Sequence, residues 1–497
     1  MPGSPEIHIV PARDLRQPRR SYRLRTYLFP AFLMSLFCVL WTASTSAGIP
    51  PQSDASSSPP EVRLSAEPGT ITQAEVPGQT NQPDARLRQS APDQSQLPDM
   101  AGVPTSLPTL LDEADRANPQ ILAARHAWKA AALVPSQAST LPDPQFTVQQ
   151  FSVGSPRPFA GFSNSDFAYV GLGVSQDLPY PGKLRLRGEI AGRDAAVAQE
   201  GYENVRRSVI EQLKEAYFQL AYEHELLRVL HRDQGLLDQV EKTAEVHYAA
   251  GQGNQQDVLK AQLQQTRLLS EIEMHHQDHG RLQAQLKQLA NRPVDAPDIV
   301  PETMTETALA YSFDDLVGRV RAQNPIVRSD EEMVRRQGLQ VELARKDLYP
   351  DFNLQYMWQH TASQFRDYYQ LSFNVRVPIH RGRKQRAELA QTAEELNQSR
   401  RQYEADVQQV SFEIRDQYLA VETSARLLKV YREGLIPQGT AAFRAGVAAY
   451  EQNRSDFESL FTSFMDVLTL DGEYWRTLAQ HETAIARLEQ LTGLKLR

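Results

Sequence analysis

The chain has 497 residues, with 53 Lys and Arg against 61 Asp and Glu, a formal net charge of −8 at pH 7 and one cysteine, Cys38. The acidic balance argues against nucleic acid as a partner, because phosphate binding requires an excess of positive charge. One cysteine excludes an internal disulfide and a site of several thiolates. The sequence contains no glycine-rich phosphate loop, nucleophile elbow or paired metal motif, so it predicts neither an enzyme nor a cofactor.

The beginning of the chain has the pattern of an export signal over residues 1–47. Several arginines precede an apolar run from Thr26 to Trp41, and small residues ending at Ala47 suit a cleavage site. The run of about 16 residues is shorter than the roughly 20 that span a bilayer, so an uncleaved anchor is the weaker interpretation. Residues 48–106 are rich in Pro, Ser and Gln and predict a disordered lead.

The rest of the chain predicts two copies of one unit, residues 107–292 and 312–497, joined by a linker at 293–311. Asn118-Pro119, a signal for the start of a helix, recurs as Asn324-Pro325. A proline that opens a strand follows each pair at the same distance. Duplication therefore fits this chain better than the two or three independent domains that its length allows.

Each copy contains a corner at which an alternating strand is followed by a charged helix. Pro179 and Gly182 mark the corner of the first copy, and Pro378 and Gly382 mark that of the second. Proline and glycine punctuate secondary structure, and the hydrophobic period changes from 2 to 3.6 across these residues. The pattern predicts a strand–helix corner in each copy.

Before each corner the sequence predicts a hairpin of strands. Apolar and polar residues alternate over 352–359 and 371–377 in the second copy, and over 146–148 and 170–175 in the first. A half-buried soluble sheet gives the same alternation. Three features favour a transmembrane β-barrel over such a soluble sheet. They are the strand length of about ten residues, the aromatic residues near the hairpin ends and the export signal. Four strands cannot close a barrel, which needs about eight, so several chains must share one.

After each corner the sequence predicts a long helical hairpin with coiled-coil seams. As a continuous helix, Leu184 to Ala250 would be roughly 100 Å long, which is too long for a compact core. Gly251 and Gly446 are expected to end the outgoing helices and turn the chain back. Asp257 and Asp456 follow at the start of the returning helices, where an acid complements the helix dipole.

This order of motifs resembles the TolC-like outer-membrane efflux protein family, the outer-membrane factors. The resemblance covers residues 107–497, and the non-lipidated chain is most similar to components of heavy-metal efflux systems. It implies a mainly α chain that forms a homotrimer. Each subunit would give four strands to a transmembrane β-barrel and long helices to a periplasmic α-helical barrel. The implied location is the outer membrane of a Gram-negative bacterium, with lipid around the strands.

The resemblance also implies a gate at the helical tips, where contacts between helices close the periplasmic aperture until an adaptor protein engages. By position the gate would comprise Asp257, Phe443, Arg454 and Asp456. The adaptor-docking tips would comprise Gly251, Gln252, Gly253, Gly446 and Val447. Phe443 stands where the family often has Tyr, so no hydrogen-bonded latch is expected there. Three copies of the two aspartates would form an acidic ring that favours cations.

The resemblance implies a passive gated duct that exports small solutes, metal ions or drugs, from an inner-membrane pump of the RND type through a periplasmic adaptor. A type I protein-secretion duct is an alternative within the same class. A periplasmic coiled-coil scaffold without a channel is an alternative from another class. The duplicated, aromatic-edged strands argue against the scaffold, which has no need of them.

One group of histidines stands apart from these motifs. His275 and His279 are one helical turn apart, the spacing of a two-histidine metal site, and His276 lies between them. The glutamate of a zinc-protease helix is missing from this segment, and the surrounding residues are polar and charged. The sequence therefore predicts an ordinary solvated helix face and no metal.

Overall fold

The computed structural model describes residues 102–154, 157, 165–452 and 454–496. They fall within one compact unit, Ser90–Arg497. The predicted export signal and the predicted disordered lead up to residue 101 lie outside the described residues. The end of that lead differs from the prediction, because β1 (Val103–Pro104) pairs in parallel with β4 (Ile299–Val300). This pairing joins the start of the first half to the segment between the halves.

Short helices open each half, and an asparagine fixes the start of one helix in each. In chain order these helices are α1 (Leu107–Ala117), α2 (Pro119–Ala131), α3 (Val134–Ser139), α6 (Phe313–Gln323) and α7 (Pro325–Lys346). The Asn118 side chain accepts hydrogen bonds from two backbone N–H groups of α2, and Asn324 does the same for α7. Each side chain also donates to a carbonyl near the end of a long helix, Leu289 O and Leu491 O respectively, at 2.9 Å.

Four strands form an antiparallel sheet in the order β2-β3-β5-β6. They are β2 (Gln145–Phe151), β3 (Tyr169–Leu178), β5 (Asp351–Thr361) and β6 (Tyr368–Arg376). The predicted hairpins are therefore present, and the pairing of β3 with β5 joins them into one sheet. Within the described residues, β2 and β6 each have one neighbour and present an unpaired edge.

One face of this sheet is apolar and exposed. The register places Phe146 beside Val174, Val174 beside Tyr356, and Tyr356 beside Leu371. All four are exposed, Phe146 by 82% and Leu371 by 72%. The opposite face carries small and polar residues over most of its length, together with Met357, which is buried over two glycines, and a stacked pair, Phe151 and Tyr169, at one end. The alternation seen in the sequence thus gives the sheet an apolar face that nothing in the described chain covers.

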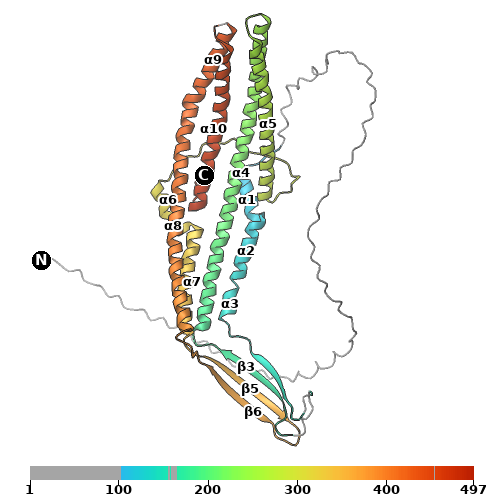
Figure 1. Cartoon of the computed structure of the whole chain (residues 1–497), viewed down its shortest axis with the longest axis vertical. Coiled ribbons are helices and arrows are strands. Elements are labelled where there is room, and N and C mark those ends of the chain that lie inside the picture. The colour runs from blue at the N-terminus through green and yellow to red at the C-terminus, as the bar shows by residue number, and fades with distance from the viewer. Residues whose placement is uncertain (1–101, 155–156, 158–164, 453, 497) are drawn as a thin grey trace, which may run out of the picture. The chain divides into compact units, whose positions relative to one another are not determined.

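Long helices form two hairpins beyond the sheet (Figure 1). The first hairpin consists of α4 (Lys183–Ala249) and α5 (Gln255–Leu289), and the second of α8 (Gln385–Val430), a π-helical turn η2 (Tyr431–Leu435), α9 (Ile436–Glu451) and α10 (Phe457–Thr492). The predicted continuous helix agrees with α4, which has 67 residues. No helix in the described part of the chain is both long enough and apolar enough to cross a membrane.

The two corners between sheet and helix differ in backbone conformation. Gly182 has a φ of 91°, in the left-handed region, and directly precedes α4, so glycine is required there. Gly382 lies in a turn before α8 and has no positive φ. At the first corner the buried Lys183 ammonium contacts Asp347 at 2.8 Å and Asp351 at 2.9 Å. This ion-pair network ties the first corner to the second half of the chain.

Candidate functional site at the helix hairpin tips

Backbone hydrogen bonds close the tip of the first hairpin. Gly251 has a φ of 74° and its N–H donates to Tyr248 O at 2.9 Å. The Gln252 N–H donates to His247 O at 2.9 Å, which completes a Schellman motif. The prediction that Gly251 ends the outgoing helix is therefore confirmed, and the glycine adopts the left-handed conformation there. Gly253 approaches His247 closely, because an added Cβ would lie 3.2 Å from the His247 Cβ.

The second tip contradicts the prediction for Gly446. Helix α9 continues through Gly446 and Val447 and ends at Glu451, and Gly446 has no positive φ. The glycine has a packing role instead, because an added Cβ would lie 3.2 Å from Ser463 Oγ on α10. Gly446 and Val447 are thus part of the outgoing helix, and the chain turns between Glu451 and α10. Arg454 is exposed in this turn, and its backbone N–H donates a hydrogen bond to Ala449 O.

The two aspartates cap the returning helices. Asp456 is the N-cap of α10 and accepts a hydrogen bond from the Ser459 N–H at 3.0 Å. Hydrogen bonds from the Ser459 side chain and backbone lower the pKa of Asp456 below its ordinary value. Asp257 closes a capping box with Asn254 at the start of α5. Each acid therefore has a local structural role at the start of its helix.

Tyr450 is a tip residue that the sequence analysis missed. Its ring stacks on His247 of α4 at a centroid distance of 4.5 Å and meets Phe457 edge to face at 6.0 Å. The ring is buried, and its hydroxyl is buried without a hydrogen-bond partner among the described residues. Burial raises the pKa of Tyr450, and the charge of Asp257 raises it further. The recurrence of Phe443, Val447 and Tyr450 at helical spacing was the available signal, since it places all three on one face.

Phe443, the predicted gate aromatic, lies farther from the tip. It is 9% exposed and packs against Phe464 of α10 at a centroid distance of 5.8 Å. Together with Val240, Tyr450 and Leu460 it lines a cavity of 270 Å³ between α4 and the second hairpin. In this position Phe443 fills space between helices of one chain.

Polar contacts also join the two hairpins. Lys260 of α5 pairs with Glu458 of α10 near the tips. Farther along the helices, Arg232 Nη2 contacts Asp471 Oδ2 at 2.6 Å and Asp233 Oδ1 at 2.7 Å. The structure therefore brings Asp257, Tyr450 and the start of α10 to one end of the packed hairpins. The contacts between hairpins are ionic, aromatic and aliphatic, because Val240 of α4 shares a buried core with Leu460 of α10.

The structure does not bring His275 and His279 together. His275 Nδ1 is 2.8 Å from Glu223 Oε2, and this hydrogen bond raises the pKa of His275. His279 lies beside His224, with ring centroids 6.4 Å apart, and burial lowers the pKa of each. His276 lies beside His231 at 6.0 Å. The partner Glu223 was not found from the sequence, because it lies 52 residues from His275 on another helix.

Comparison with known proteins gives a family and a fold. Residues 110–292 and 316–453 match the family described as outer membrane efflux protein. A search of curated proteins gave no match. The fold is similar to that of the outer-membrane channel OprN, with 15% identity, a TM-score of 0.66, and coverage of 78% of this chain and 90% of that one.

Two further structures have similar values. CusC, studied for transmembrane channel formation, has 14% identity and a TM-score of 0.68, over 79% of this chain and 92% of that one. The outer membrane protein VceC from Vibrio cholerae has 16% identity and a TM-score of 0.66. The match covers 79% of this chain and 97% of VceC.

These similarities decide several predictions. The predicted fold class is confirmed: a mainly α chain of the kind that builds a trimeric β-barrel with an α-helical barrel. The predicted location in the Gram-negative outer membrane, with a long periplasmic helical part, is also confirmed, as is the prediction that the protein is not an enzyme. The matched segments cover more than half of the sequence, and the chain therefore belongs to the outer membrane efflux protein family.

Proposed function

We propose that this protein is the outer-membrane duct of a tripartite efflux system, a passive and gated homotrimer. It receives small solutes, metal ions or drugs, from an inner-membrane pump of the RND type through a periplasmic adaptor protein. The chain supplies no chemistry of its own, so the energy for export comes from the pump. Membership of the outer membrane efflux protein family supports the duct role.

The apolar sheet face is the single observation that carries this proposal. Exposed side chains such as Phe146 and Leu371 form a continuous apolar surface across four strands. In water such a surface is unfavourable, whereas in a bilayer it faces lipid. The unpaired edges of β2 and β6 would leave backbone groups without partners in lipid, so copies of the chain join edge to edge until the barrel closes.

The gate and the docking surface follow at the other ends of the long helices. Three copies bring Asp257 and Asp456 around one axis, where like charges repel unless cations or Arg454 balance them. Tyr450 joins these residues in the proposed gate, and Phe443 supports the helix packing behind it. The docking surface for the adaptor consists of residues 251–253 and the turn that follows Glu451. An adaptor that binds the separated hairpins more tightly than the packed ones opens the duct.

A type I protein-secretion duct would have the same sheet and hairpins, so the partner pump distinguishes that alternative. A coiled-coil scaffold is disfavoured, because it leaves the apolar sheet face in water.

Opposite faces of one strand provide the test. Leu371→Arg places a charge on the apolar face of β6, at a cost of about 2–4 kcal/mol near the middle of a bilayer. Ser372→Arg, on the neighbouring residue, places the same charge on the polar face. We expect the first variant to lose most of its detergent-resistant trimer in the outer-membrane fraction and the second to retain it. Equal tolerance of both variants, or a wild-type protein that is a soluble monomer, would refute the duct.

A further inference from the structure

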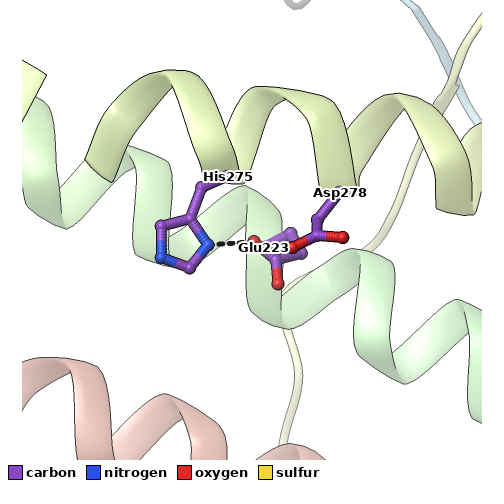
Figure 2. Close-up of side chains that lie close together, drawn as sticks. All are labelled: Glu223, His275 and Asp278. Carbon is purple, nitrogen blue, oxygen red and sulfur yellow. Dashed lines mark hydrogen bonds and ion pairs between the residues drawn. The ribbon is translucent and has the colours of Figure 1, made fainter. Parts of the chain in front are cut away.

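Three potential metal ligands converge between the arms of the first hairpin (Figure 2). Glu223 lies on α4, and His275 and Asp278 lie on α5. One donor atom of each residue lies within 4.8 Å of the others. His275 Nδ1 points toward Glu223 Oε2 at 2.8 Å, as the dashed line in Figure 2 marks. Because the ligands come from both arms, an ion bound here would link α4 to α5.

The cluster is closed on one side and open on the other. The Glu223 side chain is 8% exposed and that of His275 is 20% exposed. The Asp278 side chain is 48% exposed. An ion between them would have protein ligands on the buried side and access to water on the other. Three protein ligands with a water in the remaining position form a common arrangement for zinc.

We propose that Glu223, His275 and Asp278 bind a divalent transition-metal ion of the Zn²⁺ type. One imidazole nitrogen with two carboxylate oxygens suits Zn²⁺ and similar ions, whereas Mg²⁺ and Ca²⁺ prefer oxygen ligands alone. Zinc–ligand distances of about 2.0–2.2 Å place two tetrahedral ligands roughly 3.4 Å apart. His275 and Glu223 therefore need to separate by only about half an ångström to accept the ion in place of their shared proton.

The charges around the cluster are compatible with a bound cation. Arg281 Nε donates to Asp278 Oδ1 at 3.3 Å, but this ion pair is exposed on both sides and is weak. Arg476 of α10 donates a hydrogen bond to the Tyr222 hydroxyl, and its positive charge also interacts with Glu223. Glu271 adds a negative charge near His275 and offsets this arginine. The two cluster carboxylates are then left to neutralise a divalent ion.

The second hairpin offers a contrast. Its returning helix α10 contains His481, whose Nδ1 bonds to Ser424 Oγ at 2.8 Å and whose Nε2 bonds to Thr307 O at 2.9 Å. His481 is buried, and both of its ring nitrogens are occupied by neutral partners. His481 thus has a structural role, and among the described residues the cluster of potential ligands lies in the first hairpin. A bound ion there stabilises the packing of α4 on α5 by mass action.

The test is titration of the full chain in detergent with Zn²⁺, after purification without a histidine tag and removal of metal by a chelator. Calorimetry is expected to find one saturable site per chain. Co²⁺ in the same site should give the visible absorption of a four-coordinate ion. His275→Gln and Glu223→Gln are each expected to weaken Zn²⁺ binding at least tenfold, on the order of the loss that follows removal of groups around known metal sites.

The matched control is His276→Gln, which removes a histidine from the same helix turn without touching the cluster. We expect this variant to bind Zn²⁺ as the wild type does. Circular dichroism and the size of the assembly verify that every variant is folded. Three results would each overturn the proposal. They are a wild type without a saturable Zn²⁺ site, a His275→Gln variant that binds Zn²⁺ as tightly as the wild type, and a His276→Gln variant whose Zn²⁺ binding is weakened as much as that of His275→Gln. None of these measurements depends on conductance, so they stand apart from the test of the duct.

Discussion

In the first hairpin α4 runs unbroken for 67 residues and turns through a left-handed glycine, whereas the second hairpin divides its outgoing arm into α8, η2 and α9 (Figure 1). The interruption has a local cause. Pro437 has no N–H, and in the turn before it the Ile436 N–H bonds to Tyr431 O. An added Cβ at Gly439 would lie 2.9 Å from Leu470, so α9 and α10 approach closely beyond this point.

The comparison shows that one duplicated unit can retain its packing scheme while its local chemistry changes. The first arm has no break at which it could bend, but the second arm has a π-helical turn, and such turns mark sites of deformation. We therefore expect the second hairpin to make the larger movement when the tips separate.

The largest effect is expected where the halves are most alike. Asn118→Ala and Asn324→Ala each remove an N-cap and a buried hydrogen bond to a helix-end carbonyl. Each variant is expected to lower the free energy of unfolding by about 2 kcal/mol. Loss of the N-cap accounts for roughly 1 kcal/mol of this, and loss of the buried hydrogen bond accounts for roughly 1 kcal/mol more. Thermal unfolding followed by circular dichroism measures this effect. The exposed Asn397→Ala on α8 is the control, and a loss in only one half would contradict equivalent roles.

The next effect separates the two tip glycines. Gly251 has a φ of 74° and no atom within 4 Å of an added Cβ, so Gly251→Ala costs only backbone strain, about 1 kcal/mol. Gly446→Ala gains helix propensity and meets Ser463 at 3.2 Å, so its net effect should be close to zero. Hydrogen exchange of the Gln252 N–H should become faster in the first variant only. Faster exchange there in Gly446→Ala would contradict the assignment of this glycine to the helix interior.

A smaller, pH-dependent effect is expected at Asp330 in the second half. Burial and the neighbouring Asp406 carboxyl raise the pKa of Asp330 to about 7. Between the ordinary pKa of 3.8 and about 7, the unfolded chain loses this proton and the folded chain keeps it, so stability falls as the pH rises through that range. Both groups are partly exposed, and solvent screening limits the effect to the order of 1 kcal/mol.

Asp330→Asn removes this ionisation and should stabilise the protein at pH 8 relative to the wild type. At pH 4 the two proteins should unfold at nearly the same temperature, because the wild-type aspartic acid is then largely neutral when folded. Thermal unfolding at both pH values provides the measurement. A variant that is less stable than the wild type at pH 8 would show that the ionised carboxylate is favourable in the fold.

The elements could be predicted from the sequence because their signals are local. These signals depend only on residues that are neighbours in the sequence. They are the alternation of the strands, the Asn-Pro pairs at two helix starts and the absence of proline from α4. The tips were harder, because a glycine in a helix and a glycine after a helix look alike in sequence. At Gly446 the helix-compatible residues up to Glu451 favoured continuation. The pairs Glu223–His275 and His247–Tyr450 join different helices, and only the helix packing brings them together.

The most direct test of the gated duct is single-channel conductance of the purified trimer in a planar bilayer. Asp257→Asn and Asp456→Asn remove the tip charges and retain side chains that can cap a helix. We expect a small resting conductance in the wild type and a several-fold larger one in the double variant, with Asp416→Asn on α8 as an unchanged control. A wild-type trimer without conductance would contradict the duct, and a double variant identical to the wild type would contradict a gate at these aspartates.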